Sequence, residues 1–136
     1  MMISFFAPGE PKPQGSKNQF GGESCKLLAP WRSLISVIAR QAFGGIPPLK
    51  GSCKIDVAFH FARPKNHFGT GKRSAILKPD APTWKASKPD SDKLLRAVYD
   101  ALKGIVVDDD CQFVSGSFTK GYGDQPGAQI RVEEMK

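Results

Sequence analysis

The chain has 136 residues, of which 40% are hydrophobic, and its formal net charge is +7. That length suits one domain rather than two hydrophobic cores. No run of about 18 apolar residues is present to span a bilayer, and the opening MMISFFAPGE lacks the basic region of a signal peptide. We therefore expect a cytoplasmic protein with no membrane partner, whose three scattered cysteines are reduced thiols.

The first half of the chain predicts strand, loop, helix and strand. Residues 2–7 form a short strand, and a flexible loop rich in Pro, Gly and Ser follows over about 9–29. A helix is predicted over about 30–43, because Pro30 suits a first turn and the apolar residues recur at helical spacing. Apolar and mostly polar residues alternate over 52–62, which indicates a half-buried strand.

The second half begins with a long basic loop and a helix. Residues 63–89 have no clear periodicity, which predicts a flexible loop with a functional role. The next segment, 91–103, places its apolar residues on one helical face. Asp90 suits the N-cap of that helix, and Gly104 suits its C-terminal stop.

Two further strands are predicted over about 112–120 and 128–134, joined most simply as an antiparallel pair through the turn GYGDQPG. The order is then strand, helix, strand, helix, strand, strand. This order predicts a single α+β domain over residues 1–136, with two main helices packed on a small mixed sheet.

Positive charge is concentrated between Arg63 and Arg96, where nine basic residues face three acidic ones. Such a patch attracts polyanions by its summed potential, although a surface that only favours solubility is the simpler alternative. If the partner is DNA, the candidate contacts are Lys12, Lys17, Arg63, Lys65, Lys72, Arg73, Lys88 and Lys93.

Five aspartates of this basic chain lie within one short region. Asp90 and Asp92 stand at the start of the predicted helix, and Asp108, Asp109 and Asp110 follow its end. One interpretation is purely structural, because an N-cap and a favourable helix dipole explain the first pair and a solvated turn explains the other three.

The other interpretation is a metal site. A helix of about 12 residues is about 18 Å long, and the seven residues from Gly104 to Asp110 reach about 23 Å when extended. The chain can therefore return so that Asp90, Asp92 and either Asp109 or Asp110 converge. Converging carboxylates require a compensating cation, and Mg²⁺ or Mn²⁺ prefers such ligands.

A metal site within a positive surface suggests phosphodiester hydrolysis, in which the metal activates water and basic residues hold the backbone. Arg96, one helical turn after Asp92, is positioned to stabilise negative charge at the phosphorus. An ion pair between Arg96 and Asp92 is its structural alternative, and both roles are compatible.

The region KPDSDKLLRAVYDALKGIVVDDDCQ resembles the RusA family of Holliday junction resolvases, whose core reads D-x-D, then D-A-L, then D-D-x-Q. The opening FFAPGEPKPQGSK is also similar to phage-borne members. The resemblance implies a homodimeric endonuclease that requires Mg²⁺ or Mn²⁺ and nicks two strands of a four-way DNA junction symmetrically.

By the motifs, the metal-binding residues are Asp90, Asp92 and Asp110, and Asp109 is the accessory acid. Arg96 falls where the family has an essential lysine, and it completes the catalytic set with the three metal-binding aspartates. Two alternatives stay open: a non-catalytic DNA-binding protein, and a related metal-dependent nuclease with another DNA substrate.

Overall fold

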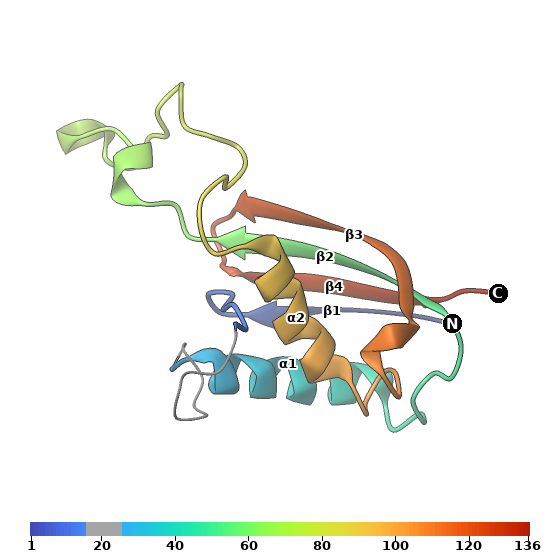
Figure 1. Cartoon of the computed structure of the whole chain (residues 1–136). Helices are drawn as coiled ribbons and strands as arrows, with labels where there is room; N and C mark the ends of the chain where they lie inside the picture. The colour runs from blue at the N-terminus through green and yellow to red at the C-terminus, as the bar shows by residue number, and fades with distance from the viewer. Residues whose placement is uncertain (16–25) are drawn as a thin grey trace.

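The structure is a computed structural model that describes residues 1–15 and 26–136 (Figure 1). Within them, two α-helices and four strands alternate in the predicted order, and short 3-10 helices lie in the connections. In chain order the elements are β1 (Met2–Pro8), α1 (Leu28–Phe43), β2 (Cys53–Phe61), η1 (Lys65–His67), η2 (Gly71–Arg73), α2 (Ser91–Leu102), η3 (Asp110–Gln112), β3 (Phe113–Tyr122) and β4 (Gly127–Glu134). The predicted α+β class is confirmed.

The four strands form one mixed sheet in the order β1-β4-β2-β3. β2 is parallel to β3 and antiparallel to β4, and β4 is antiparallel to β1. The predicted antiparallel pairing of the last two strands is therefore wrong. β2 buries alternate residues along its whole length and lies between β3 and β4. The turn after β3 crosses the end of β2, where the Gly123 amide donates to the Phe61 carbonyl at 3.0 Å.

Both helices pack on one face of the sheet (Figure 1). α1 buries residues one turn apart, among them Trp31, Ile35 and Ala39, and α2 buries an apolar stripe that includes Leu94 and Val98. The inward side chains of β2 and β4 complete the core. The periodicity that predicts the helices is the same periodicity that buries them.

The predicted loop 63–89 contains η1 and η2, and most of it projects beyond the end of the sheet (Figure 1). We call residues 64–84 the basic arm. Its return is attached to the free edge of β3, because Trp84 forms a β-bridge with Gly121 and the Lys85 amide donates to the Lys120 carbonyl at 2.8 Å. None of the helices in the described ranges has the length and apolarity needed to cross a bilayer.

Candidate nuclease site

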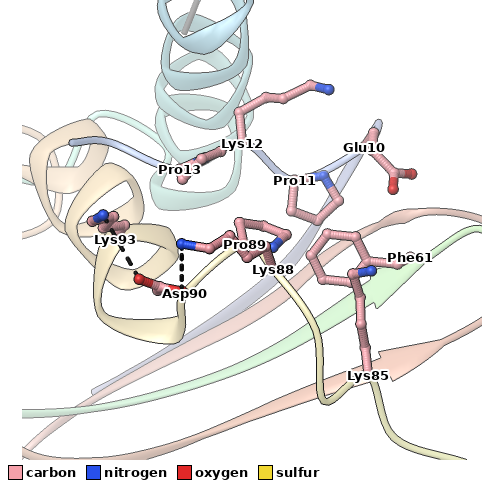
Figure 2. Close-up of a pocket in the computed structure, with 10 residues that line it drawn as sticks. All are labelled: Glu10, Pro11, Lys12, Pro13, Phe61, Lys85, Lys88, Pro89, Asp90 and Lys93. Atoms are coloured by element: carbon pink, nitrogen blue, oxygen red, sulfur yellow. Dashed lines mark ion pairs between the residues drawn. The ribbon is translucent and has the colours of Figure 1, made fainter. Parts of the chain in front are cut away.

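Asp90 occupies the predicted N-cap position of α2, but its side chain makes no capping hydrogen bond. Its carboxylate instead lies 3.8 Å from the Lys88 amine and 3.7 Å from the Lys93 amine (Figure 2). The negative charge at this end of the helix is therefore shared between two exposed lysines, and such pairs are readily exchanged for a ligand because they contribute little stability in water.

Asp92 and Arg96 are both exposed on α2. In the part of the chain that the structure describes, no ion pair joins Asp92 to Arg96, so the structural alternative for Arg96 is not observed. The Arg96 guanidinium stands one turn beyond Asp92 and is available to a ligand.

Asp109 and Gln112 form a capping box around η3. The Asp109 carboxylate accepts from the Cys111 amide at 3.2 Å, and the Asp109 amide donates to Gln112 Oε1 at 2.9 Å. Gln112 Nε2 donates in turn to the carbonyls of Leu49 and Gly51 at 2.7 and 2.9 Å. Gln112 thus ties the acidic turn to the segment before β2, which is a physical reason for glutamine in the D-D-x-Q motif.

The structure separates Asp108 from the two aspartates that follow it. Asp108 forms an ion pair with Lys50 at 2.8 Å, whereas the side chains of Asp109 and Asp110 are hydrogen-bonded to each other. In the sequence, only the position of Gln112 indicates which two of the three aspartates form the D-D pair of the motif. The structure agrees with that alignment, because Asp109 and Asp110 are the two that interact.

The two carboxyls of this pair have opposite pKa shifts. The pKa of Asp110 is raised above its ordinary value by the hydrogen bond shared with Asp109, by burial and by the Asp109 charge. The pKa of Asp109 is lowered, first by the hydrogen bond from the Cys111 amide, then by the one with Asp110 and by the charge of Lys103. Asp110 is therefore the member of the pair that takes up a proton first.

The Asp109–Asp110 pair lies beside the last turn of α2 and not beside its first turn. Lys103 Nζ is 3.9 Å from an Asp109 carboxylate oxygen, and the ring of Phe113, three residues after Asp110, is centred 5.1 Å from that of Tyr99. Asp90 and Asp92 belong to the opposite end of the helix (Figure 1). Over the described residues, no three His, Cys, Asp or Glu side chains form a group that could hold a metal ion. The convergence predicted from the sequence is therefore wrong within a single chain.

The segment after α2 explains this separation. Instead of extending back along the helix, it closes a tight turn in which the Gly104 amide donates to the Val107 carbonyl at 2.7 Å. Val106 and Val107 are fully buried in that turn. To reach the first turn of α2, Asp110 would need the segment after the helix to be extended. That segment is folded into the turn instead, because the two valines are buried there.

The donor set of Asp109–Asp110 fits a hard divalent cation. Mg²⁺ is commonly held by one or two carboxylates together with substrate phosphates rather than by a complete protein cage. Asp109 and Asp110 share a hydrogen bond only while one of them is protonated, and a bound cation would take the place of that proton between the two carboxylates. Asp90 and Asp92 do not join this set within one chain.

The predicted DNA contacts lie in two places. Lys65, Lys72 and Arg73 are exposed on the basic arm. Lys12, Lys88 and Lys93 line a cavity of about 490 Å³ beside Asp90 (Figure 2). Lys17 is outside the described residues.

Arg63 and Lys85 have surroundings that the sequence does not predict, and the predicted DNA contact of Arg63 stays a prediction. The Arg63 guanidinium lies 4.8 Å from the centre of the Tyr122 ring and donates to the Pro82 carbonyl at 2.7 Å, so it attaches the basic arm to the sheet. Lys85 lines the same cavity as Lys12, although it was not among the predicted contacts. The only feature of the sequence that points to Lys85 is its place in the basic segment between Arg63 and Arg96, because a sequence does not show which lysines line the same cavity.

Two comparisons bear on the family. The family described as Endodeoxyribonuclease RusA matches residues 8–133. The chain is also similar to a protein of Bacillus subtilis (strain 168) named Uncharacterized protein YqaN, with 26% identity over 92 residues. That alignment spans 64% of this chain and 61% of the relative. The first match covers nearly the whole sequence, including both acidic motifs and the capping box. The chain therefore belongs to the RusA family of endodeoxyribonucleases.

Proposed function

We propose that this protein is a divalent-metal-dependent endonuclease that cuts branched DNA, with the four-way Holliday junction as its substrate. The observation that carries the proposal is the Asp109–Asp110 pair, in which a shared hydrogen bond raises the pKa of Asp110 inside a chain of net charge +7. A protein that only binds DNA gains nothing from paired carboxylates, because they repel phosphate.

In this proposal Asp109 and Asp110 hold Mg²⁺ or Mn²⁺, and Asp90 and Asp92 supply the other carboxylates. The bound metal would polarise a phosphoryl oxygen and lower the pKa of the attacking water. Arg96 lies midway along α2 without a carboxylate partner among the described residues, and it donates to the phosphate as negative charge develops there. The basic arm and the lysines around Asp90 hold the flanking backbone.

A second copy of the chain is needed to bring the two acidic groups together. β3 is the outer strand of the sheet, and residues 114–119 are exposed on both faces, with Val114 59% and Phe118 47% exposed. A long edge strand with few charges is an unprotected pairing site. We therefore place the homodimer contact at β3, between residue 113 and the bridge at Gly121.

Antiparallel pairing of β3 with its symmetry mate would complete the site. β3 begins directly after η3, the short helix that starts at Asp110. Its other end lies beside the segment that leads to Asp90, since Lys120 Nζ donates to the Ser87 carbonyl at 2.8 Å. A two-fold axis across β3 reverses these ends. Asp110 of one protomer would then face Asp90 of the partner subunit, and two identical sites would result.

The test is cleavage of a synthetic four-way junction beside matched linear duplex, with Mg²⁺, with Mn²⁺ and with EDTA. We expect metal-dependent paired nicks in the junction and a loss of at least about 100-fold on Asp110→Asn, since even residues that only support metal ligands contribute 10–100-fold. Asp108→Asn is the matched control, because Asp108 pairs with Lys50 outside the site, and its rate should stay within about twofold of the wild type.

A non-catalytic DNA-binding role is the second candidate, and one observation favours it: a single chain does not assemble a three-carboxylate group within the described residues. Tight junction binding without cleavage in either metal, by a protein shown to be dimeric, would establish that alternative and exclude the nuclease.

A further inference from the structure

The cavity beside Asp90 has the form of a small-molecule site and is distinct from the Asp109–Asp110 pair. Its volume of about 490 Å³ lies within the range of sites that enclose small ligands, about 300–1,000 Å³. Figure 2 shows it between the loop after β1, the end of β2 and the segment that leads into α2. We call it the lysine pocket, after the four lysines in its wall: Lys12, Lys85, Lys88 and Lys93.

The wall of the lysine pocket is held in place before any ligand binds. Pro11 is fully buried, and the loop on either side of it is hydrogen-bonded to distant elements. The Gly9 amide donates to the Pro126 carbonyl at 3.0 Å, and the Gln14 amide donates to the Lys93 carbonyl at 3.0 Å. A pocket formed by fixed backbone loses little entropy when it is occupied.

The four lysines do not carry equal free charge. Lys88 and Lys93 share the Asp90 carboxylate. Lys12 and Lys85 are half-buried and form no ion pair with a carboxylate in the described ranges. The Lys85 amine donates only to the Ser87 hydroxyl at 3.0 Å and lies 5.3 Å from the centre of the Phe61 ring. Figure 2 shows the Lys12 side chain directed away from the other three lysines, so Lys85 is the cation that an anion bound in the pocket would contact.

The rest of the lining is apolar, so a bare phosphate would leave part of the pocket unused. Phe61 lines the pocket but is only 2% exposed, and the half-buried rings of Pro13 and Pro89 offer apolar surface at the wall. A nucleotide matches this lining, because its phosphate can contact a lysine while its base packs on the apolar proline rings.

We propose that the lysine pocket binds one unpaired nucleotide of the DNA substrate, with its phosphate on Lys85 and its base against the proline rings. A paired base must first leave the duplex to reach this pocket, and that costs least where stacking is already interrupted, as at a branch point. The pocket adjoins Asp90, so its occupation would position the strand at the acidic residues. This inference rests on the proposed function and names the feature by which branched DNA is selected.

The direct test uses thymidine 5′-monophosphate as the probe, with the full-length protein in EDTA, followed by amide chemical shifts in NMR. We expect saturable shifts at residues 10–13, 61 and 85–93, and binding at least about tenfold weaker for thymidine and for inorganic phosphate. Phosphate that binds as tightly as the nucleotide would overturn the base-binding half of the proposal. Absence of saturable shifts at these residues would overturn all of it.

Variants then assign the binding to named side chains. Lys85→Ala should weaken binding of the nucleotide about tenfold, the effect of losing one charge-assisted contact. Lys54→Ala removes the same charge from a lysine paired with Asp56 at 4.0 Å, outside the pocket, and should change the affinity less than twofold. Equal effects from both variants would show that only net charge matters and would overturn the proposal. Thermal melts check that each variant is folded.

Because the probe binds without metal, the outcome is separable from cleavage. A protein that binds the nucleotide in the lysine pocket but does not cut a junction supports the pocket and refutes the proposed nuclease. A protein that cuts a junction but gives no saturable nucleotide binding refutes the pocket alone.

Discussion

At the scale of single residues, three consecutive aspartates have three different environments. Asp108 is neutralised by Lys50, Asp109 caps η3, and Asp110 shares a hydrogen bond with Asp109. Their sequence positions differ by one residue each, so the difference arises from the turn that holds them. Gln112 holds that turn through hydrogen bonds to the carbonyls of Leu49 and Gly51, which lie 63 and 61 residues earlier in the chain.

The raised pKa of Asp110 has a consequence for stability. The cause is first the hydrogen bond shared with Asp109, then burial and the Asp109 charge. An aspartate whose native pKa exceeds its unfolded pKa destabilises the fold as pH rises through the native pKa, because the unfolded chain releases that proton earlier. In EDTA we expect Asp110→Asn to raise Tm slightly at pH 7, because solvent screens much of the effect, with the difference vanishing near about pH 3, where both states are protonated.

Differential scanning calorimetry of the two proteins at both pH values makes this measurement. Asp108→Asn serves as the control, because loss of an exposed ion pair should change Tm little. A lower Tm for Asp110→Asn at pH 7 would show that the carboxylate is stabilising in the native state and that the sign of its shift is wrong.

At the scale of elements, the close approach of β3 to β2 depends on Gly116. A Cβ at this position would lie 1.8 Å from the Ile55 carbonyl oxygen, and the backbone φ is +157°. We expect Gly116→Ala to lower the free energy of unfolding by about 3 kcal/mol or more, since β3 must separate from β2 to relieve the overlap. Urea denaturation measures the change. Gly51→Ala, where a Cβ meets nothing within 4 Å, should change it far less.

The basic arm is the element on which the salt dependence of DNA binding should rest. Lys72 and Arg73 are exposed in η2, and each phosphate contact contributes about 0.9 to the slope of log affinity against log salt concentration. Replacing both by alanine should reduce that slope by up to about 1.8, measured by fluorescence anisotropy on a junction in EDTA. Lys54→Ala should leave the slope unchanged, and an unchanged slope for the double variant would place the arm outside the DNA interface.

At the scale of the whole molecule, the homodimer through β3 makes a prediction that a site within one chain does not. Asp90→Asn and Asp110→Asn should each be inactive as pure homodimers. When the two are mixed and allowed to exchange subunits, one of the two sites in a heterodimer would contain both native aspartates, so nicking should return to a fraction of the wild-type rate. An inactive mixture with demonstrated exchange would contradict the shared site.

Most of the element pattern was predictable because it is local. The apolar spacing of α2, the alternation of β2 and the turn residues around them act over fewer than about ten residues, and the structure places these elements within one or two residues of their predicted bounds. The acidic motifs were likewise visible in the sequence. Their roles in metal binding remain proposals.

The sequence by itself determined the order of elements, the α+β class and the family, because periodicity and short motifs are readable without knowledge of distant contacts. Only the tertiary structure decided that β3 lies beside β2 rather than β4, that Asp109 pairs with Asp110, and that Asp90 is at the other end of α2. These outcomes depend on the burial of Val106 and Val107 and on the pairing of β2 with β3 along one edge and with β4 along the other. Both are contacts between residues far apart in the chain, and no local pattern encodes them.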